Sequence, residues 1–220
     1  SRTCTILLAE DGSATVVNEP GPTIEDASHL LSRFDGLLES SRAVALMGSL
    51  PPGLPSDTFA SMVERAREKK RPSLLDTSGE PLVRGLAARP SVAKPNRAEA
   101  EALLRRDLSS DASRREGVAA LRSLGADTAI ITFGVEGFLL TTEEGLARCS
   151  TTSSSDLRLG NPTGAGDALA AGYLAGTVRG YPPLECARLA GASAVASLAE
   201  GYGRFRPKDV RVEAVLVEEL

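Results

Sequence analysis

The chain has 220 residues, enough for one α/β domain with a substantial core or for two small domains. Its 25 Lys and Arg residues are outnumbered by 29 Asp and Glu residues, giving a net charge of −4 and no basic surplus for a nucleic acid or an anionic membrane. No apolar run is long enough to span a bilayer. From the charge and the lack of such a run, we expect neither a nucleic acid nor a membrane as a partner.

The cysteines and the single histidine narrow the chemistry further. Cys4, Cys149 and Cys186 are odd in number and far apart, which is typical of reduced thiols in a cytoplasmic protein rather than of a disulfide framework or a zinc site. His29 is the only histidine, so a histidine-based catalytic triad and a multi-histidine metal site are excluded. The chain begins at Ser1 rather than at Met, so the lack of a secretory leader says little.

The N-terminal residues predict a hairpin followed by a helix. Residues 3–9 indicate a strand, residues 10–13 (Glu-Asp-Gly-Ser) a turn, and residues 14–17 a second strand. The run at 18–22 (Asn-Glu-Pro-Gly-Pro) breaks regular structure, and a helix is expected at 24–39.

Short strands then alternate with helices. Residues 43–47 form an apolar run without alternation, as expected for a strand buried on both faces of a parallel sheet. Residues 57–70 predict a helix with one apolar stripe on the sheet, formed by Phe59, Met62, Val63 and Ala66. The next elements are a strand at 73–75, a helix to about Ala88, a strand at 91–94, a helix opened by Asn96, a polar helix from Asp111 to Gly125, and strands at 127–132, at 138–142 and ending near Cys149. This alternation implies parallel strands with right-handed crossovers.

Three loops at strand ends have both a structural and a functional interpretation. Residues 48–55 (Gly-Ser-Leu-Pro-Pro-Gly-Leu-Pro) fall where ligands bind in open α/β sheets, but they also suit a rigid connection. In residues 94–99 (Lys-Pro-Asn-Arg-Ala-Glu), Asn96 and Glu99 have the spacing of a capping box, which needs no chemistry at all. The third loop is the glycine-containing turn at 132–137, and a turn of this kind is so common that by itself it favours a structural interpretation.

Residues 161–168 (Asn-Pro-Thr-Gly-Ala-Gly-Asp-Ala) indicate a loop that opens directly into a helix. Thr163 is an acceptable N-cap, and the unpaired N–H groups of the first turn, with the helix dipole, would hold a phosphate. The backbone could approach closely because the side chains are minimal at Gly164, Ala165 and Gly166. Asp167 would repel a phosphate, so it suits a general base that takes a proton from an attacking hydroxyl. The alternative is a glycine-rich turn with an acid favourably placed in the first helical turn.

Beyond this helix, residues 181–183 (Tyr-Pro-Pro) form a break. A second helix then carries small and apolar residues on one face, which allows close packing against its neighbour: Leu184, Ala187, Gly191, Ala194, Val195 and Leu198. The tail after Gly201 is polar and mixed, and we assign no function to it.

Together these stretches resemble the ribokinase-like (phosphofructokinase B) family of carbohydrate kinases, in the family's order and from Arg2 to about Gly203. The resemblance implies an α/β, doubly wound, mostly parallel sheet with helices on both faces. It also implies transfer of the γ-phosphoryl group of Mg-ATP to a sugar hydroxyl. Asp167 would then be the catalytic base, and the anion hole would consist of Gly164, Ala165 and Gly166.

The same resemblance implies roles for other residues. Those that would bind the nucleotide are Lys94, Thr132, Gly134, Gly137 and Asn161, the last standing where many members have Asp. Asn96 and Glu99 would organise Mg²⁺ and its waters, and this role is compatible with a capping box. The helix that follows residues 181–183 would wall the adenine pocket.

Residues 18–22 and 48–55 resemble the 1-phosphofructokinase and tagatose-6-phosphate kinase branch, in which an Arg at the position of Arg2 can bind a sugar phosphate. The implied acceptor is fructose 1-phosphate, fructose 6-phosphate or tagatose 6-phosphate. Cys4 and Ile6 depart from the Asn and Lys usual in this branch, so a kinase of an unphosphorylated sugar stays an alternative.

The family also has an N-terminal lobe with the first sheet strand, a β lid and an acidic residue that binds sugar hydroxyls. We therefore expect residues 1–220 to form a single kinase domain that is incomplete at its N-terminus. The alternative hypothesis, from outside the enzymes, is a truncated module that binds a nucleotide without catalysis. The expected partners are ATP and a sugar phosphate, in the cytoplasm, and the sequence leaves homodimer formation open.

Overall fold

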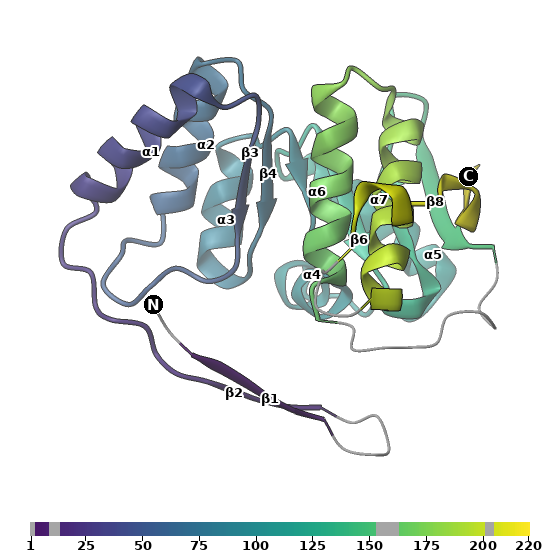
Figure 1. Ribbon diagram of the computed structural model, residues 1–220, viewed down its shortest axis with the longest axis horizontal. Helices are drawn as coiled ribbons and strands as arrows, with labels where there is room; N and C mark the ends of the chain where they lie inside the picture. Colours follow the sequence, from purple (N-terminus) through teal and green to yellow (C-terminus); the bar gives the residue numbers. More distant parts are fainter. Residues whose placement is uncertain (1–2, 9–13, 153–162, 201–204) are drawn as a thin grey trace.

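A seven-stranded sheet with helices on both faces forms the body of the computed structural model, which describes residues 3–8, 14–152, 163–200 and 205–220 (Figure 1). The strands stand in chain order: β3 (Val44–Met47), β4 (Ser73–Asp76), β5 (Val92–Ala93), β6 (Thr128–Thr132), β7 (Phe138–Thr141), β8 (Leu146–Thr151) and β9 (Val215–Glu219). The helices are α1 (Ser28–Ser40), α2 (Thr58–Glu68), α3 (Gly79–Ala87), α4 (Arg97–Leu104), α5 (Asp111–Ser123), α6 (Ala165–Val178) and α7 (Pro183–Glu200). Short 3-10 turns are η1 (Gly134–Glu136), η2 (Pro207–Asp209) and η3 (Val212–Ala214).

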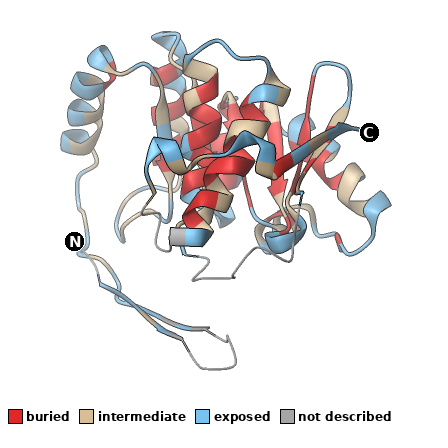
Figure 2. Ribbon diagram, turned by 45° about the vertical axis from the view of Figure 1, so that its right-hand side comes forward, coloured by how far each residue is buried: buried red, intermediate tan, exposed pale blue. Residues whose placement is uncertain are grey.

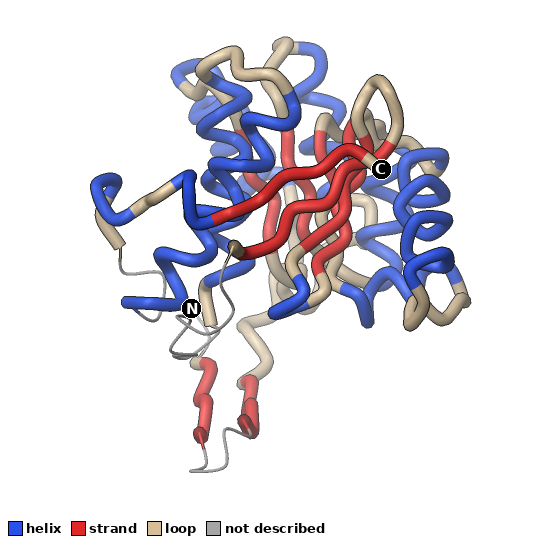
Figure 3. The backbone as a smooth tube through the Cα atoms, turned by 90° about the vertical axis from the view of Figure 1, so that its right-hand side faces the viewer, coloured by secondary structure: helices blue, strands red, loops and turns tan. Residues whose placement is uncertain are grey.

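The sheet changes from parallel to antiparallel at β6. Strands β3 to β6 pair in parallel because helical segments connect them, as the alternation of elements predicted. Short turns connect β6 to β7 and β7 to β8, and these strands and β9 pair antiparallel (Figure 3). The predicted α/β class is therefore confirmed, and its parallel part consists of four strands.

Side chains of the strands alternate between two hydrophobic cores, one on each face of the sheet. Leu75 and Ile131 belong to the core that packs against helices α2 to α5, whereas their neighbours Leu74 and Ile130 belong to the core beneath α6 and α7. Figure 2 shows the buried residues concentrated along the sheet and in the two helices that cover it. The stripe predicted for the helix at 57–70 faces the core in α2, where Phe59, Met62, Val63 and Ala66 are all buried.

The expectation that residues 43–47 are buried on both faces is wrong. In β3 only Leu46 is buried, Ala45 is exposed, and Val44 and Met47 are half-buried. The reason is that β3 stands at the edge of the described sheet and pairs with β4 alone. Burial on both faces instead describes β4, whose first three residues, Ser73 among them, are all buried.

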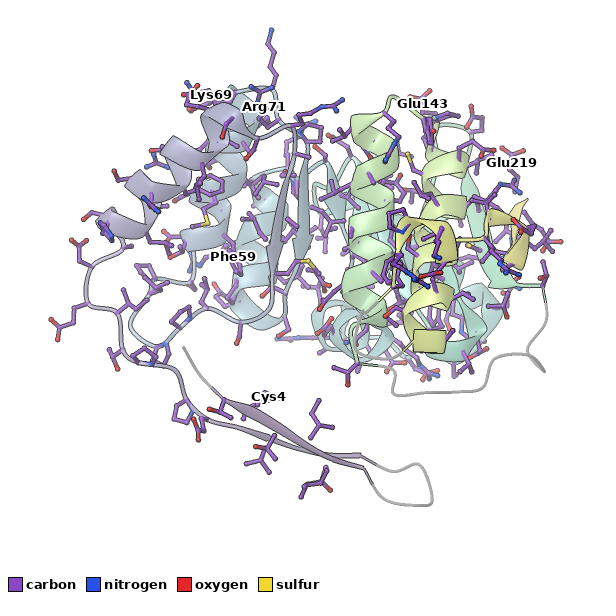
Figure 4. The ribbon with its side chains drawn as sticks, viewed as in Figure 1. Cys4, Phe59, Lys69, Arg71, Glu143 and Glu219 are labelled. Carbon is purple, nitrogen blue, oxygen red and sulfur yellow. The ribbon has the colours of Figure 1, made fainter. Side chains whose placement is uncertain are left out.

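A hairpin of β1 (Cys4–Leu8) and β2 (Ala14–Asn18) forms a separate two-stranded sheet, as the sequence predicted. The tubes in Figure 3 show this pair apart from the main sheet, and Figure 4 places Cys4 on it, away from the body of the molecule. The chain returns to the body through a backbone hydrogen bond from Ile24 N–H to the Pro52 carbonyl, 2.8 Å long. Helix α1 begins at Ser28, four residues later than predicted.

Helices α6 and α7 pack with almost no space between their backbones. A Cβ on Gly172 would lie 2.8 Å from the Leu189 carbonyl oxygen, and one on Gly176 would lie 3.1 Å from Cys186 Cα. The predicted close packing is confirmed, and glycines of α6 make it possible. Although α6 is apolar on most of its surface, no helix within the described ranges is long and apolar enough to cross a membrane.

Candidate active site

The first turn of α6 presents unpaired backbone N–H groups at the carboxyl edge of the parallel strands. The helix begins at Ala165, and its first internal bond runs from Ala168 N–H to the Gly164 carbonyl. Gly164 is the N-cap, with a left-handed φ of +89°, so the prediction that Thr163 caps this helix is wrong. A glycine is favoured there because a side chain would strain this conformation. Asp167 lies in the same turn and is exposed.

A buried ion pair lies next to this helix start. Lys94 directly follows β5 and is 3% exposed, and its Nζ is 2.7 Å from Oδ2 of Asp76, the last residue of β4. A Cβ on Gly166 would lie 3.6 Å from the same Nζ, so the ammonium group is close to the first turn of α6. The two strands end side by side because they are parallel neighbours, with Lys94 N–H bound to the Leu75 carbonyl.

Asp76 has a perturbed pKa in this environment. Burial raises the pKa of its carboxyl above the ordinary value for Asp, and the charge of Asp167 raises it further, while Lys94 opposes the shift. Asp76, Lys94 and Asp167 therefore interact electrostatically at one place. Asp76 was not predicted as a site residue, although its position at the end of a predicted parallel strand was the available signal.

One pocket of about 270 Å³ connects the turn after β6 with the start of α6. Predicted nucleotide residues and predicted anion-hole residues line it together: Thr132, Gly134, Gly137, Ala165 and Gly166. Its wall on α7 includes Gly191, Ala194, Val195 and Leu198, which belong to the face predicted to carry small and apolar side chains. The pocket could hold a ligand with an apolar group between α7 and the turn and an anionic group at α6.

The turn at 132–137 requires its glycines. Gly134 has a φ of +63° and Gly137 a φ of +87°. A Cβ on Gly137 would lie 2.0 Å from the Cys149 carbonyl oxygen, so the backbone of Gly137 lies directly against β8. It closes with a hydrogen bond of 2.8 Å from Phe133 N–H to the Gly137 carbonyl.

The capping box at the start of α4 is present. The Asn96 side chain accepts a hydrogen bond of 3.0 Å from Glu99 N–H, and the Glu99 carboxylate accepts one of 2.8 Å from Asn96 N–H. Asn96 also forms a parallel bridge with Thr132, so the box adjoins the turn that lines the pocket. Within the described ranges, no group of three or more His, Cys, Asp or Glu residues could hold a metal ion.

The loop at 48–55 borders the same edge of the sheet. Gly48 N–H binds the Asp76 carbonyl at 2.8 Å, and the Thr77 hydroxyl binds the Gly48 carbonyl at 2.7 Å. The predicted site residues Arg2 and Asn161 lie outside the described residues. The structure thus brings together Lys94, the turn at 132–137 and the start of α6, with Asn96 beside them.

Comparisons with known proteins support the family resemblance found in the sequence. Residues 1–208 match the pfkB family of carbohydrate kinases. The chain is 37% identical over 223 residues to a 1-phosphofructokinase of Xanthomonas campestris, covering 96% of this chain and 68% of the relative. It is 33% identical over 180 residues to a 1-phosphofructokinase of Bacillus subtilis, covering 81% of this chain and 58% of the relative.

Solved structures show the same fold. A possible 1-phosphofructokinase of Thermotoga maritima superposes with a TM-score of 0.85 at 24% identity, covering 100% of this chain and 71% of that one. The ribokinase of Arabidopsis thaliana, solved with ribose and ATP, superposes with a TM-score of 0.73 at 20% identity, covering 95% of this chain and 67% of that one. At these identities the likeness shows the ribokinase-like fold alone.

Proposed function

Because the chain belongs to the pfkB family of carbohydrate kinases, we propose that it transfers the γ-phosphoryl group of ATP to a hydroxyl of a phosphorylated ketohexose. The observation that supports this most is the single pocket lined by both the turn at 132–137 and the start of α6. Two relatives named 1-phosphofructokinase favour fructose 1-phosphate as the acceptor over fructose 6-phosphate and tagatose 6-phosphate. The same proposal places the enzyme in the cytoplasm and leaves open whether it forms a homodimer.

In this proposal different residues bind the nucleotide, hold the transferred phosphoryl group and accept the proton. The apolar wall on α7 and the turn at 132–137 bind the nucleoside part of ATP, and the N–H groups of Gly164, Ala165 and Gly166 hold the transferred phosphoryl group. Lys94 supplies a positive charge beside the first turn of α6. Asn161 is assigned to nucleotide binding. Asp167 takes the proton from the attacking hydroxyl, and Arg2 binds the phosphate of the sugar.

Mg²⁺ fits this arrangement only as an ion shared with the substrate. The described residues contain no protein cluster that would hold it alone, and Mg²⁺ typically keeps several waters and binds phosphates plus one or two carboxylates. In this proposal Asn96 and Glu99, whose capping box adjoins Thr132, orient those waters. When bound, the ion would neutralise charge on the phosphates.

A coupled assay for ADP release, with phosphorylated and free ketohexoses as acceptors, tests the proposal. We expect turnover with a ketohexose phosphate, and Asp167→Asn should lower kcat by about 10²- to 10⁴-fold while ATP affinity is kept. Asp127→Asn, which changes an exposed acid just before β6, is the matched control and should retain activity. Near-normal turnover of Asp167→Asn would remove Asp167 from the mechanism.

Other results of the assay separate the rivals. Turnover with free sugars alone would indicate a kinase of unphosphorylated sugars, and ATP binding without turnover would indicate a binding module. The role given to Mg²⁺ predicts that Glu99→Gln requires more Mg²⁺ for half-maximal rate without a lower Tm. A lower Tm with unchanged Mg²⁺ dependence would leave Glu99 as a helix cap only.

A further inference from the structure

Arg114 of α5 uses every nitrogen of its guanidinium group in contacts near the turn that follows β6. Nη1 and Nη2 donate to the two carboxylate oxygens of Glu136 at 2.7 and 2.9 Å, and Nε donates to the Leu108 carbonyl at 3.0 Å. The guanidinium carbon also lies 4.7 Å from the centre of the Phe133 ring. Only 15% of the Arg114 side chain is exposed, so these contacts hold it in one place.

Besides Leu108, Arg114 contacts two residues of the turn itself, and these stand at the two ends of η1. Phe133 is the N-cap of this turn and Glu136 is its last residue. The pocket is lined by Thr132, Gly134, Val135 and Gly137, whereas Phe133 and Glu136 lie outside its lining. Arg114 therefore fixes the back of the segment whose front faces the pocket.

The chemistry of the contact calls for an arginine. A planar guanidinium can bind a carboxylate with two parallel hydrogen bonds and lie over an aromatic ring at the same time, whereas an ammonium cannot do both. Its hydrogen bonds lower the pKa of Glu136, and the same bonds raise the pKa of Arg114, so the pair stays charged at neutral pH. Because residues 134 and 137 are glycines, the turn has few side chains of its own that could fix its conformation. The contacts of Arg114 with Phe133 and Glu136 supply that restraint.

We propose that Arg114 is a positioning residue for nucleotide binding, which holds the turn at 132–137 in the shape that lines the pocket. This inference rests on the proposed function, because it takes the pocket to be the ATP site. Arg114 touches no part of the pocket itself. Its effect on ATP should therefore pass entirely through Phe133 and Glu136.

The test compares Arg114→Lys with Arg115→Lys. Arg115 is the next residue of α5 and also forms an ion pair, with Asp111 at 2.9 Å, but it does not contact the turn. In Arg114→Lys we expect KM for ATP, and the Kd for ATP from direct titration, to rise about 3- to 10-fold, with kcat and KM for the acceptor within about twofold of wild type. Arg115→Lys should change none of these values.

Two further measurements separate positioning from general stability. Hydrogen exchange of residues 133–137 in the free chain should become faster in Arg114→Lys and not in Arg115→Lys, at equal Tm. Because Glu136 carries the effect, Glu136→Gln should raise the Kd for ATP as well, and the double variant should be little worse than either single one.

Unchanged exchange of the turn, or faster exchange with unchanged ATP affinity, would overturn the inference. If the wild-type chain binds no ATP, the proposed function fails and the nucleotide part of the inference fails with it. The exchange experiment still reports, independently of any nucleotide, whether Arg114 holds the turn.

Discussion

The ion pair of Lys94 and Asp76 shows which residues of the candidate site could be predicted from the sequence and which could not. Lys94 stood in a recognisable motif, whereas Asp76 ended an ordinary strand, and only the pairing of β4 with β5 brings the two together. Asn96 and Glu99 were predictable as a capping box because both partners lie within four residues of each other. Spacing along the chain therefore predicts contacts within a turn of helix, but contacts between strands need the fold.

Removing the cation of this pair should make stability depend more steeply on pH. The pKa of Asp76 is raised in the folded chain, so its stabilising contribution is complete below the unfolded pKa and is lost as pH rises through the folded pKa. Lys94→Met removes the group that opposes this shift, which raises the pKa of Asp76 further. We expect a loss of about 3 kcal/mol in unfolding free energy at pH 8 and a clearly smaller loss at pH 5, measured by urea denaturation.

The control for this variant is Lys69→Met. Lys69 pairs with Glu39 on the surface, where both side chains are more than half exposed, so the change should have little effect at either pH. An equal loss at pH 5 and pH 8 in Lys94→Met would show that the charge of Asp76 is not what Lys94 offsets.

At the scale of elements, the helices were more predictable than the edges of the sheet. The apolar stripe of α2 follows from local periodicity, so the sequence alone located it. Burial of β3 was overestimated because an apolar run does not reveal whether a strand has one neighbour or two. Strand β9 was missed, although its run of Val215, Leu216 and Val217 is typical of a strand, because the surrounding tail is polar.

The contact between α6 and α7 predicts opposite effects for two Gly→Ala changes within helices. A Cβ on Gly172 would lie 2.6 Å from Ser193 Oγ and 2.9 Å from Ala190 Cα, and backbone cannot move aside cheaply. Gly172→Ala should therefore lower the unfolding free energy by about 1–3 kcal/mol despite the better helix propensity of Ala. In Gly36→Ala of α1, the new Cβ meets nothing within 4 Å apart from the backbone of its own helix, and stability should rise by up to about 1 kcal/mol.

Chemical denaturation of both variants in the same buffer measures the difference. If Gly172→Ala were as stabilising as Gly36→Ala, the two helices would have to separate easily. The close contact would then contribute little to the fold.

At the scale of the whole molecule, two cores share one sheet, and the hairpin of β1 and β2 belongs to neither. Both hydrophobic clusters draw their residues from beyond the hairpin, and the described side chains of the hairpin include Leu7 at 59% and Val17 at 54% exposure. Figure 1 shows the hairpin on the side of the sheet where α6 begins. The turn residues of the sequence predicted the hairpin. They could not predict where the hairpin lies relative to the site, because a local sequence pattern does not determine the position of one element relative to another.

This separation leads to a prediction about a chain shortened to residues 20–220. An isolated two-stranded hairpin is at most marginally stable and buries little apolar surface here, so its removal should leave Tm and the Kd for ATP unchanged. Phosphoryl transfer depends on holding the acceptor and excluding water, and the hairpin is the element on the open side of the site. We therefore expect kcat/KM for the ketohexose phosphate to fall by about tenfold or more, with KM for ATP unchanged. Thermal unfolding, nucleotide titration and the coupled assay on the two chains measure the three quantities. A fall in Tm would show that the hairpin supports the core, and an unchanged kcat/KM would show that it takes no part in binding the acceptor.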